Sequence, residues 1–115
     1  MNDEKIIKKL EEFKLPIGNR RIYENELDNY NYFIFRRGRL IESGCNKFVR
    51  QIQIIYAFTG EQKISDFDII NKIKELNLNF VGMDSDDVQI ADTNDWIDLN
   101  IYTFERPERG DNNGI

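Results

Sequence analysis

Acidic residues near position 85 form the run of the chain that most resembles a metal-binding motif. The run 84–87 (DSDD) is similar to the start of an EF-hand calcium loop. Such a loop also needs a glycine at its sixth position and a glutamate at its twelfth. Counted from Asp84, these positions hold Gln89 and Asp95. We therefore interpret the run as a solvated turn and predict no metal site there.

Other residue types that carry catalysis are scarce. The chain has no histidine and a single cysteine, Cys45. This excludes histidine-based catalytic triads, histidine-ligated metals, an internal disulfide and a cysteine-rich zinc site. The carboxylates fall in polar stretches or at outward strand positions, and the seven glycines are scattered singly, so neither a buried acid–base pair nor a phosphate-binding loop is indicated. We expect no catalytic residues, no cofactor and no enzymatic activity.

A cluster of arginines directly follows an aromatic segment, YNYFIFRR at 30–37. The cluster consists of Arg36, Arg37 and Arg39. Together with Tyr30, Tyr32 and Phe35, these arginines could hold single-stranded nucleic acid by charge and stacking. Against this, the net charge of the chain is −5, and general nucleic-acid binding relies on an excess of Lys and Arg. A small nucleic-acid-binding module remains an alternative function.

The charges are divided unevenly between two segments. Residues 36–50 hold five basic residues and one acid, a net charge of +4. Residues 84–98 hold six acids and no base, a net charge of −6. Opposite charge on two parts of one domain is compatible with head-to-tail self-association. The alternative is that both are ordinary solvated loops, since exposed charges contribute little to stability.

The elements that must position these residues fit one domain. The chain has 115 residues, 40% of them hydrophobic and 12% aromatic, which suffices for one core. We expect a single domain over residues 1–107 and a mobile tail over 108–115, which contains several Gly and Asn residues. The charged N-terminus lacks a secretory apolar core, and we expect a soluble intracellular protein.

Apolar spacing predicts two helices. Over residues 3–15, Ile6, Leu10 and Phe13 recur at helical intervals, and Pro16 ends the segment. Over residues 65–76, Ser65 provides an N-cap. The core-facing stripe of this second helix is expected to be Phe67, Ile69, Ile70, Ile73 and Leu76.

Strands are predicted between and after these helices. Residues 30–37 and 48–58 indicate strands, separated by a connector over 39–46. Residues 79–83 form a short strand or a helix exit, and 88–91 with 96–106 form an antiparallel hairpin. The order α-β-β-α-β-β-β predicts an α+β fold, in which two helices pack on a mostly antiparallel sheet.

Several segments together resemble a known family. They are the helix IIKKLEEF at 6–13, the strand FVRQIQIIYAF at 48–58, the helix IINKIKEL at 69–76 and the closing strand WIDLNIYTFERP at 96–107. In this order, over residues 3–107, they are similar to the tail terminator, or head–tail joining, proteins of long-tailed bacteriophages.

The resemblance implies a structural protein of the virion tail, assembled in the host cytoplasm. Such proteins form a hexameric ring that caps the tail tube, halts its polymerisation and docks to the head connector. DNA passes through the ring without specific binding, and no membrane is involved. The resemblance itself carries over no site residues. From their charge, we expect Arg36, Arg37, Arg39 and Arg50 to contact neighbouring proteins. We expect Asp84, Asp86 and Asp87 to line an acidic lumen, where like charge repels DNA.

Other functions stay open beside this one. The chain could be another small neck protein of the head–tail junction, or the nucleic-acid-binding module described above. A metabolic enzyme ranks last, because the chain lacks histidine, a nucleophile with a partner base and a phosphate loop.

Overall fold

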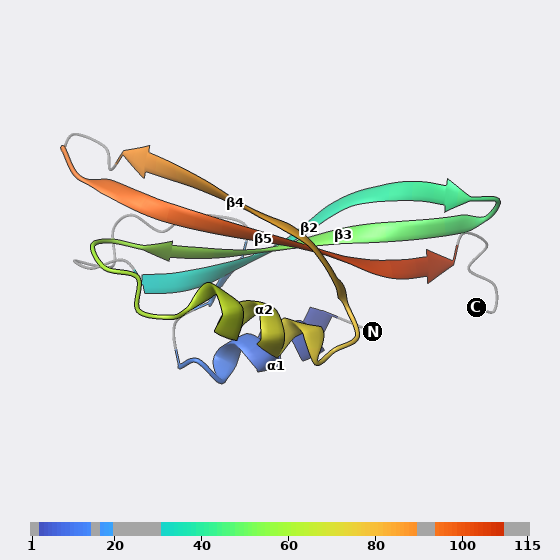
Figure 1. The fold of residues 1–115 in the computed structure, drawn as a ribbon, viewed down its shortest axis with the longest axis horizontal. Helices are drawn as coiled ribbons and strands as arrows, with labels where there is room; N and C mark the ends of the chain where they lie inside the picture. The colour runs from blue at the N-terminus through green and yellow to red at the C-terminus, as the bar shows by residue number, and fades with distance from the viewer. Residues whose placement is uncertain (1–2, 15–16, 20–30, 90–93, 110–115) are drawn as a thin grey trace.

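The computed structural model describes residues 3–14, 17–19, 31–89 and 94–109. Within these ranges, one five-stranded sheet carries two helices on one of its faces (Figure 1). The elements in chain order are α1 (Asp3–Glu11), β1 (Ile17–Asn19), β2 (Asn31–Gly44), β3 (Lys47–Phe58), α2 (Asp66–Lys74), β4 (Asn79–Gln89) and β5 (Trp96–Arg109). The expected α+β class, with a mostly antiparallel sheet and two helices, is confirmed.

The strands lie in the order β1-β2-β3-β5-β4. The short strand β1 is parallel to β2, and the other neighbours are antiparallel. In detail, the order differs from the prediction, because β1 adds a strand before β2 and only two strands follow α2. Three residues of β1 are too few to show strand periodicity in a sequence.

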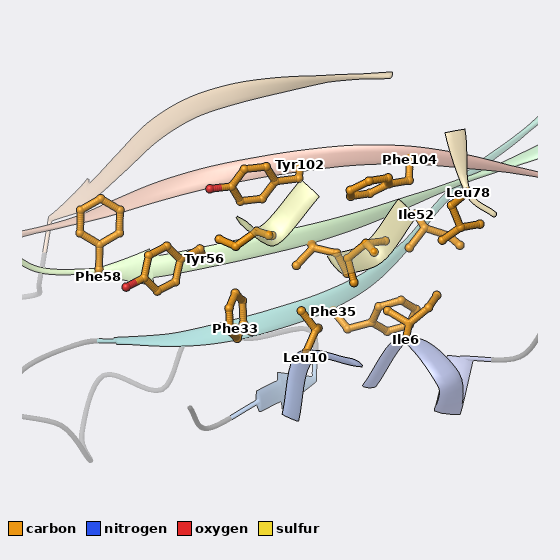
Figure 2. Close-up of a cluster of buried hydrophobic side chains, with 13 residues drawn as sticks. Ile6, Leu10, Phe33, Phe35, Ile52, Tyr56, Phe58, Leu78, Tyr102 and Phe104 are labelled. Atoms are coloured by element: carbon orange, nitrogen blue, oxygen red, sulfur yellow. The ribbon is translucent and has the colours of Figure 1, made fainter. Parts of the chain in front are cut away.

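The face of the sheet beneath the helices holds the larger core. Alternate residues of β3 point into it, as their spacing predicts. Thirteen buried side chains from both helices and the sheet meet there (Figure 2). They are Ile6, Leu10, Phe33, Phe35, Ile52, Ile54, Tyr56, Phe58, Ile69, Ile73, Leu78, Tyr102 and Phe104. This core fixes both helices to the centre of the sheet.

The opposite face of the sheet carries a second buried cluster. It consists of Tyr32, Ile34, Ile55, Ala57, Ile97 and Leu99. The two clusters use alternate residues of the same strands, for example Ile54 on the helix side and Ile55 on the other. The central part of the sheet is therefore apolar on both faces, which explains why residues 54–58 of β3 are all apolar.

The start of α2 follows from a local side-chain bond. The Ser65 hydroxyl accepts hydrogen bonds from the backbone N–H groups of Phe67 (3.1 Å) and Asp68 (3.3 Å), as the predicted N-cap requires. The predicted stripe is wrong at Phe67, which is 75% exposed. Ile69 and Ile73 are buried, and Phe67 precedes Ile69 by two residues, which turns its side chain away from the core.

Three predicted boundaries are corrected. The expected connector over 39–46 is mostly strand, because β2 continues to Gly44 and the turn is confined to residues 45–46. The acidic run 84–87 is not a turn but part of β4, which is continuous over 79–89. At the N-terminus, α1 ends at Glu11, and Pro16 lies outside the described residues.

At the C-terminus, β5 continues to Arg109, so the first two residues of the expected tail belong to the sheet. The rest of that tail, 110–115, lies outside the described residues. None of the described helices combines the length and apolarity needed to cross a membrane.

One end of the sheet extends past both helices (Figure 1). We call this part the arm; it consists of residues 36–44 of β2, 47–51 of β3 and 105–109 of β5. The molecule measures 50 × 27 × 21 Å and its radius of gyration is 15.6 Å. A compact domain of this length has a radius of about 13 Å. The arm, together with the end of β4 and β5 that projects on the other side, makes the domain long rather than round (Figure 1).

Candidate functional site

The four arginines expected to contact neighbouring proteins all lie in the arm. Arg36, Arg37 and Arg39 are exposed on β2, and Arg50 is half-buried on β3. Arg36 lies on the face opposite the helices, since its neighbour Phe35 belongs to the helix-side core. The structure therefore gathers these residues at one end of the molecule but spreads them over both faces of the sheet.

A bulge in β2 separates the arginines. Gly38 and Arg39 together oppose the single residue Gln51, because Arg37 pairs with Ile52 and Leu40 pairs with Arg50. A Cβ atom on Gly38 would lie 3.1 Å from the Gln51 carbonyl oxygen and 3.2 Å from the Gln51 Cβ. Glycine at position 38 therefore lets β2 approach β3 closely at the base of the arm.

Arg50 is held within its own chain. Its Nη2 lies 3.3 Å from Glu108 Oε2, and its Nη1 donates to the Gly38 carbonyl at 3.3 Å. Glu108 Oε1 also lies 3.8 Å from Arg106 Nη2. Arg50 and Arg106 are opposite each other on adjacent strands, and Glu108 offsets the repulsion between them. Arg50 thus stabilises the arm, whereas Arg36 and Arg39 are exposed on β2.

Near the tip of the arm the surface is hollowed. The groove has a volume of about 450 Å³. Its walls come from the β2–β3 turn and the end of β5: Ser43, Asn46, Lys47, Phe48, Val49, Pro107 and Glu108. The lone cysteine, Cys45, is exposed in the same turn. The groove is open and contains no arrangement of groups that indicates a reaction.

The three aspartates expected to line a lumen lie at the other end of the sheet. Asp84, Asp86 and Asp87 are exposed on β4. Asp84 and Asp86 pair with Ile101 and Leu99, residues of the face opposite the helices. Asp87 lies on the helix side, directly opposite Asp98. We call residues 84–89 and 94–98 the acidic end; within it, Trp96 is 51% exposed.

Two strand edges of the described sheet are not paired with another strand. β4 forms one edge over its whole length. At the other side, β1 pairs with β2 only at Phe33, Ile34 and Phe35. Within the described ranges, residues 36–44 of β2 therefore have no strand on their outer side. An open edge presents N–H and C=O groups that can pair with another chain.

Sequence reasoning missed a buried polar cluster where α2 meets the sheet. Asp66 Oδ1 accepts hydrogen bonds from the Tyr102 hydroxyl (2.5 Å), the Gln62 amide (2.8 Å) and the Asn100 amide (3.3 Å). The Tyr102 side chain is fully buried and Asn100 is 6% exposed. Burial and the Asp66 carboxylate raise the pKa of Tyr102 far above its ordinary value of 10.0, so the phenol stays protonated and donates.

The same cluster places a second tyrosine hydroxyl nearby. The hydroxyl ends of Tyr56 and Tyr102 point toward the same end of the core (Figure 2). Burial raises the pKa of Tyr56, while the backbone N–H groups of Lys63 and Ile64 partly oppose this change. No sequence signal links Asp66 to β5, which brings Asn100 and Tyr102 to one face of the sheet. We interpret the cluster as a joint that fixes the first turn of α2.

Ion pairs between the helices lie outside this joint. Lys9 Nζ is 2.7 Å from Glu75 Oε1, and Lys72 Nζ is 2.9 Å from Glu12 Oε1. The hydrogen bond from Lys72 lowers the pKa of Glu12 and that from Lys9 lowers the pKa of Glu75. The Glu12 partner in turn raises the pKa of Lys72. These exposed pairs orient α1 against α2.

No protein-family model matches the chain, and no curated protein sequence matches it. Within the ranges that the structure describes, no three Asp, Glu, Cys or His side chains are grouped so that they could hold a metal ion.

The geometry of the arginine cluster bears on the nucleic-acid hypothesis. Stacking on bases needs exposed aromatic rings next to the arginines. Tyr32 is 2% exposed and Phe35 is 6% exposed, and both belong to the cores. Tyr30 lies outside the described residues. In the described part of the chain, the arginines of β2 therefore lack the aromatic platform that this hypothesis requires.

Proposed function

We propose that this chain is a structural protein that works by assembling with copies of itself. Within that class, we propose that it is a tail terminator of a long-tailed bacteriophage. It would form a ring that caps the tail tube and joins the tube to the head connector. Its partners would be further copies of the chain, the tail tube protein and the connector, and the assembled ring would belong to the virion.

The observation that carries this proposal is the arm. It extends three strands past the helices, although the domain would bury more surface by staying compact. Its side chains of Ile41, Phe48 and Val49 are only partly buried, and Leu40 is 45% exposed. An extended, incompletely covered part of a sheet is suited to contact with another protein.

The distribution of charge supports contact between unlike surfaces. The arm carries the exposed arginines of β2, and the acidic end at the opposite tip carries the aspartates of β4 (Figure 1). Two arms repel each other, and so do two acidic ends, whereas the arm of one copy attracts the acidic end of another. Contacts between two different surfaces of one chain repeat from copy to copy, and they close into a ring when the rotation permits.

The test is assembly alone and on tail tubes. We expect light scattering after size-exclusion chromatography to show a species larger than a monomer, either in the purified chain or after addition of tubes built from the tail-tube protein of a long-tailed phage. Electron microscopy should then show ring-shaped particles, and rings at the ends of the tubes. A monomer at every concentration that also leaves tube ends bare contradicts the proposal.

A further control separates this function from a binding module. Single-stranded DNA and RNA are offered to the chain at low ionic strength, where electrostatic binding is strongest. We expect no measurable binding. Binding that is lost in an Arg36→Glu and Arg39→Glu variant, in a chain that forms no rings, would instead support the nucleic-acid module.

A further inference from the structure

We propose that copies of this chain join edge to edge, with the arm part of β2 in one copy pairing with β4 of the next to make a continuous sheet. This inference specifies the contact within the proposed assembly and so rests on the proposed function. The occupant of each open edge is a second copy of the same chain, which presents the other edge.

Both edges have backbone that is open for pairing. Residues 36–44 of β2 and the whole of β4 have no strand on their outer sides among the described residues. Such edges are usually blocked by charges or bulges, since they can otherwise template aggregation. Here both edges are charged, but with opposite signs: exposed arginines on β2 and exposed aspartates on β4.

The charges on the two edges select among the possible pairs of edges. Pairing two β2 edges brings arginines together, and pairing two β4 edges brings aspartates together, so both symmetric contacts are repulsive. Only the unlike pair, β2 with β4, brings opposite charges together. The charges thus disfavour symmetric dimers and leave a contact that propagates from copy to copy.

The direction and the register of β2 and β4 also allow this pairing. β4 is antiparallel to β5, β5 to β3 and β3 to β2, so β4 runs antiparallel to β2 and a neighbour in the same orientation offers an antiparallel pair. Within one chain, Arg36 of β2 pairs with Gln53 of β3, and both Gln53 and Gly82 of β4 pair with Thr103 of β5. Arg36 and Gly82 therefore lie at the same level along the strands.

If Arg36 faces Asp86 of the next copy instead of Gly82, the two copies are displaced by four residues along the strands. An even shift keeps each side chain on its own face of the sheet. Strands that tilt around a closed ring produce a stagger of this kind. With this shift the contact is confined to residues 36–44 of β2 and 79–86 of β4, because β1 already occupies the outer side of β2 at residues 33–35.

Single cysteines provide the test, in a background where Cys45→Ser removes the natural thiol. One variant carries Arg36→Cys and another carries Asp86→Cys. Oxidised alone, each should stay uncrosslinked; mixed, they should give a disulfide dimer containing one chain of each kind. A chain with both cysteines should give a ladder of linked chains on a non-reducing gel.

Charge reversal gives an independent measurement. We expect an Arg36→Glu and Arg39→Glu variant, and an Asp84→Lys and Asp86→Lys variant, each to lose most self-association, by tenfold or more in affinity. The two mixed together should assemble again, because every β2 edge then meets a β4 edge of opposite charge. Lys8→Glu with Lys74→Glu is the matched control, since both lysines are exposed on the helices and away from these edges. Circular dichroism confirms that each variant folds.

The outcomes separate this inference from the proposed function. Rings that form while the double-cysteine chain gives no ladder, or single-cysteine variants that crosslink alone, overturn the edge pairing but leave the terminator function standing. A ladder with recovery in the charge-reversed mixture, but without rings or binding to tubes, supports the edge pairing and contradicts the terminator function. Folded chains with neither ladder nor assembly contradict both.

Discussion

The centre and the arm are made from the same three strands but differ in what covers them. In the centre, β2, β3 and β5 are buried on both faces, by the helix-side core on one and by a second apolar cluster on the other. In the arm, Arg106 is the single buried side chain among those described. The strands are therefore held differently: the centre by apolar packing, and the arm by its backbone ladder and the bonds of Arg50 and Glu108.

Most of the apolar burial therefore lies in the centre of the sheet, whereas the arm keeps an incompletely covered surface. The centre can supply most of the free energy of folding, because apolar burial is the largest favourable contribution. The arm contributes little burial of its own and leaves its surface for other contacts. Substitutions in the two regions should therefore affect different measurements.

The largest expected effect is the loss of a buried side chain in the centre. Ile54 is fully buried, so Ile54→Ala removes packing and leaves a cavity. We expect the free energy of unfolding to fall by about 2–5 kcal/mol, measured by urea denaturation. Leu40→Ala in the arm, where the side chain is 45% exposed, should cost less than about 0.5 kcal/mol. Equal costs at the two sites would contradict the division between centre and arm.

The next effect concerns the joint between α2 and the sheet. Tyr102→Phe removes the hydroxyl that donates to Asp66, and should lower the free energy of unfolding by about 1.5–3 kcal/mol, as for hydrogen bonds to charged groups. Asp68→Asn, an exposed change in the same helical turn, is the control and should be nearly neutral.

The pH dependence of Tyr102 has a definite sign. Its pKa in the folded chain is raised above 10.0, so above pH 10 the unfolded chain loses this proton first. Stability should therefore decline as the pH rises past 10, and decline less steeply in Tyr102→Phe. Parallel pH profiles of the two proteins would contradict a bonded, buried phenol at this position.

A smaller effect is expected at the base of the arm. Gly38→Ala places a Cβ 3.1 Å from the Gln51 carbonyl oxygen, so β2 and β3 must move apart by a few tenths of an ångström. We expect a cost of about 1 kcal/mol, with faster amide hydrogen exchange confined to the arm. Gly82→Ala in β4 is the matched control, since a Cβ there meets nothing within 4 Å. Faster exchange in the centre would show that the arm is not an independent unit.

The smallest effect concerns the exposed ion pairs between the helices. The pKa values of Glu12 and Glu75 are lowered from 4.5, so their contribution is present above pH 4.5 and is lost as the pH falls through their folded values. Acid should loosen α1 from α2 slightly, and high salt should weaken this dependence. Glu12→Gln with Glu75→Gln should flatten the acid side of the thermal stability profile, and an unchanged profile would rule these pairs out as its cause.

The same comparison explains how far the sequence predicted the fold. The centre was predictable, because burial imposes a period on apolar residues: the strands expected over 48–58 and 96–106 and the Ser65 cap are present. The extension of β2 to Gly44 was missed. Its arm residues are mostly polar, and they are extended because they pair with β3 rather than because of their own types.

For the candidate site, the sequence indicated which charged residues to consider but not how they are arranged. Sequence reasoning selected Arg50 for contact with other proteins, while the structure places Glu108 from a distant strand against it. It took the aspartates of 84–87 for a turn, while they lie in an edge strand. The partners of Asp66 on β5 are more than thirty residues away in the chain, and no local pattern indicates such a contact.

The position of β5 in the sheet has a consequence for synthesis. β5 lies between β3 and β4, although it is the last of these strands in the chain. As the polypeptide leaves the ribosome, β4 has no partner, and one side of β3 stays open, until β5 emerges. The helices can gather on the β2–β3 hairpin earlier, but the sheet closes only after β5 has been synthesised. Nascent chains released before β5 is synthesised would expose the unpaired edges of β3 and β4, to which another chain can bind.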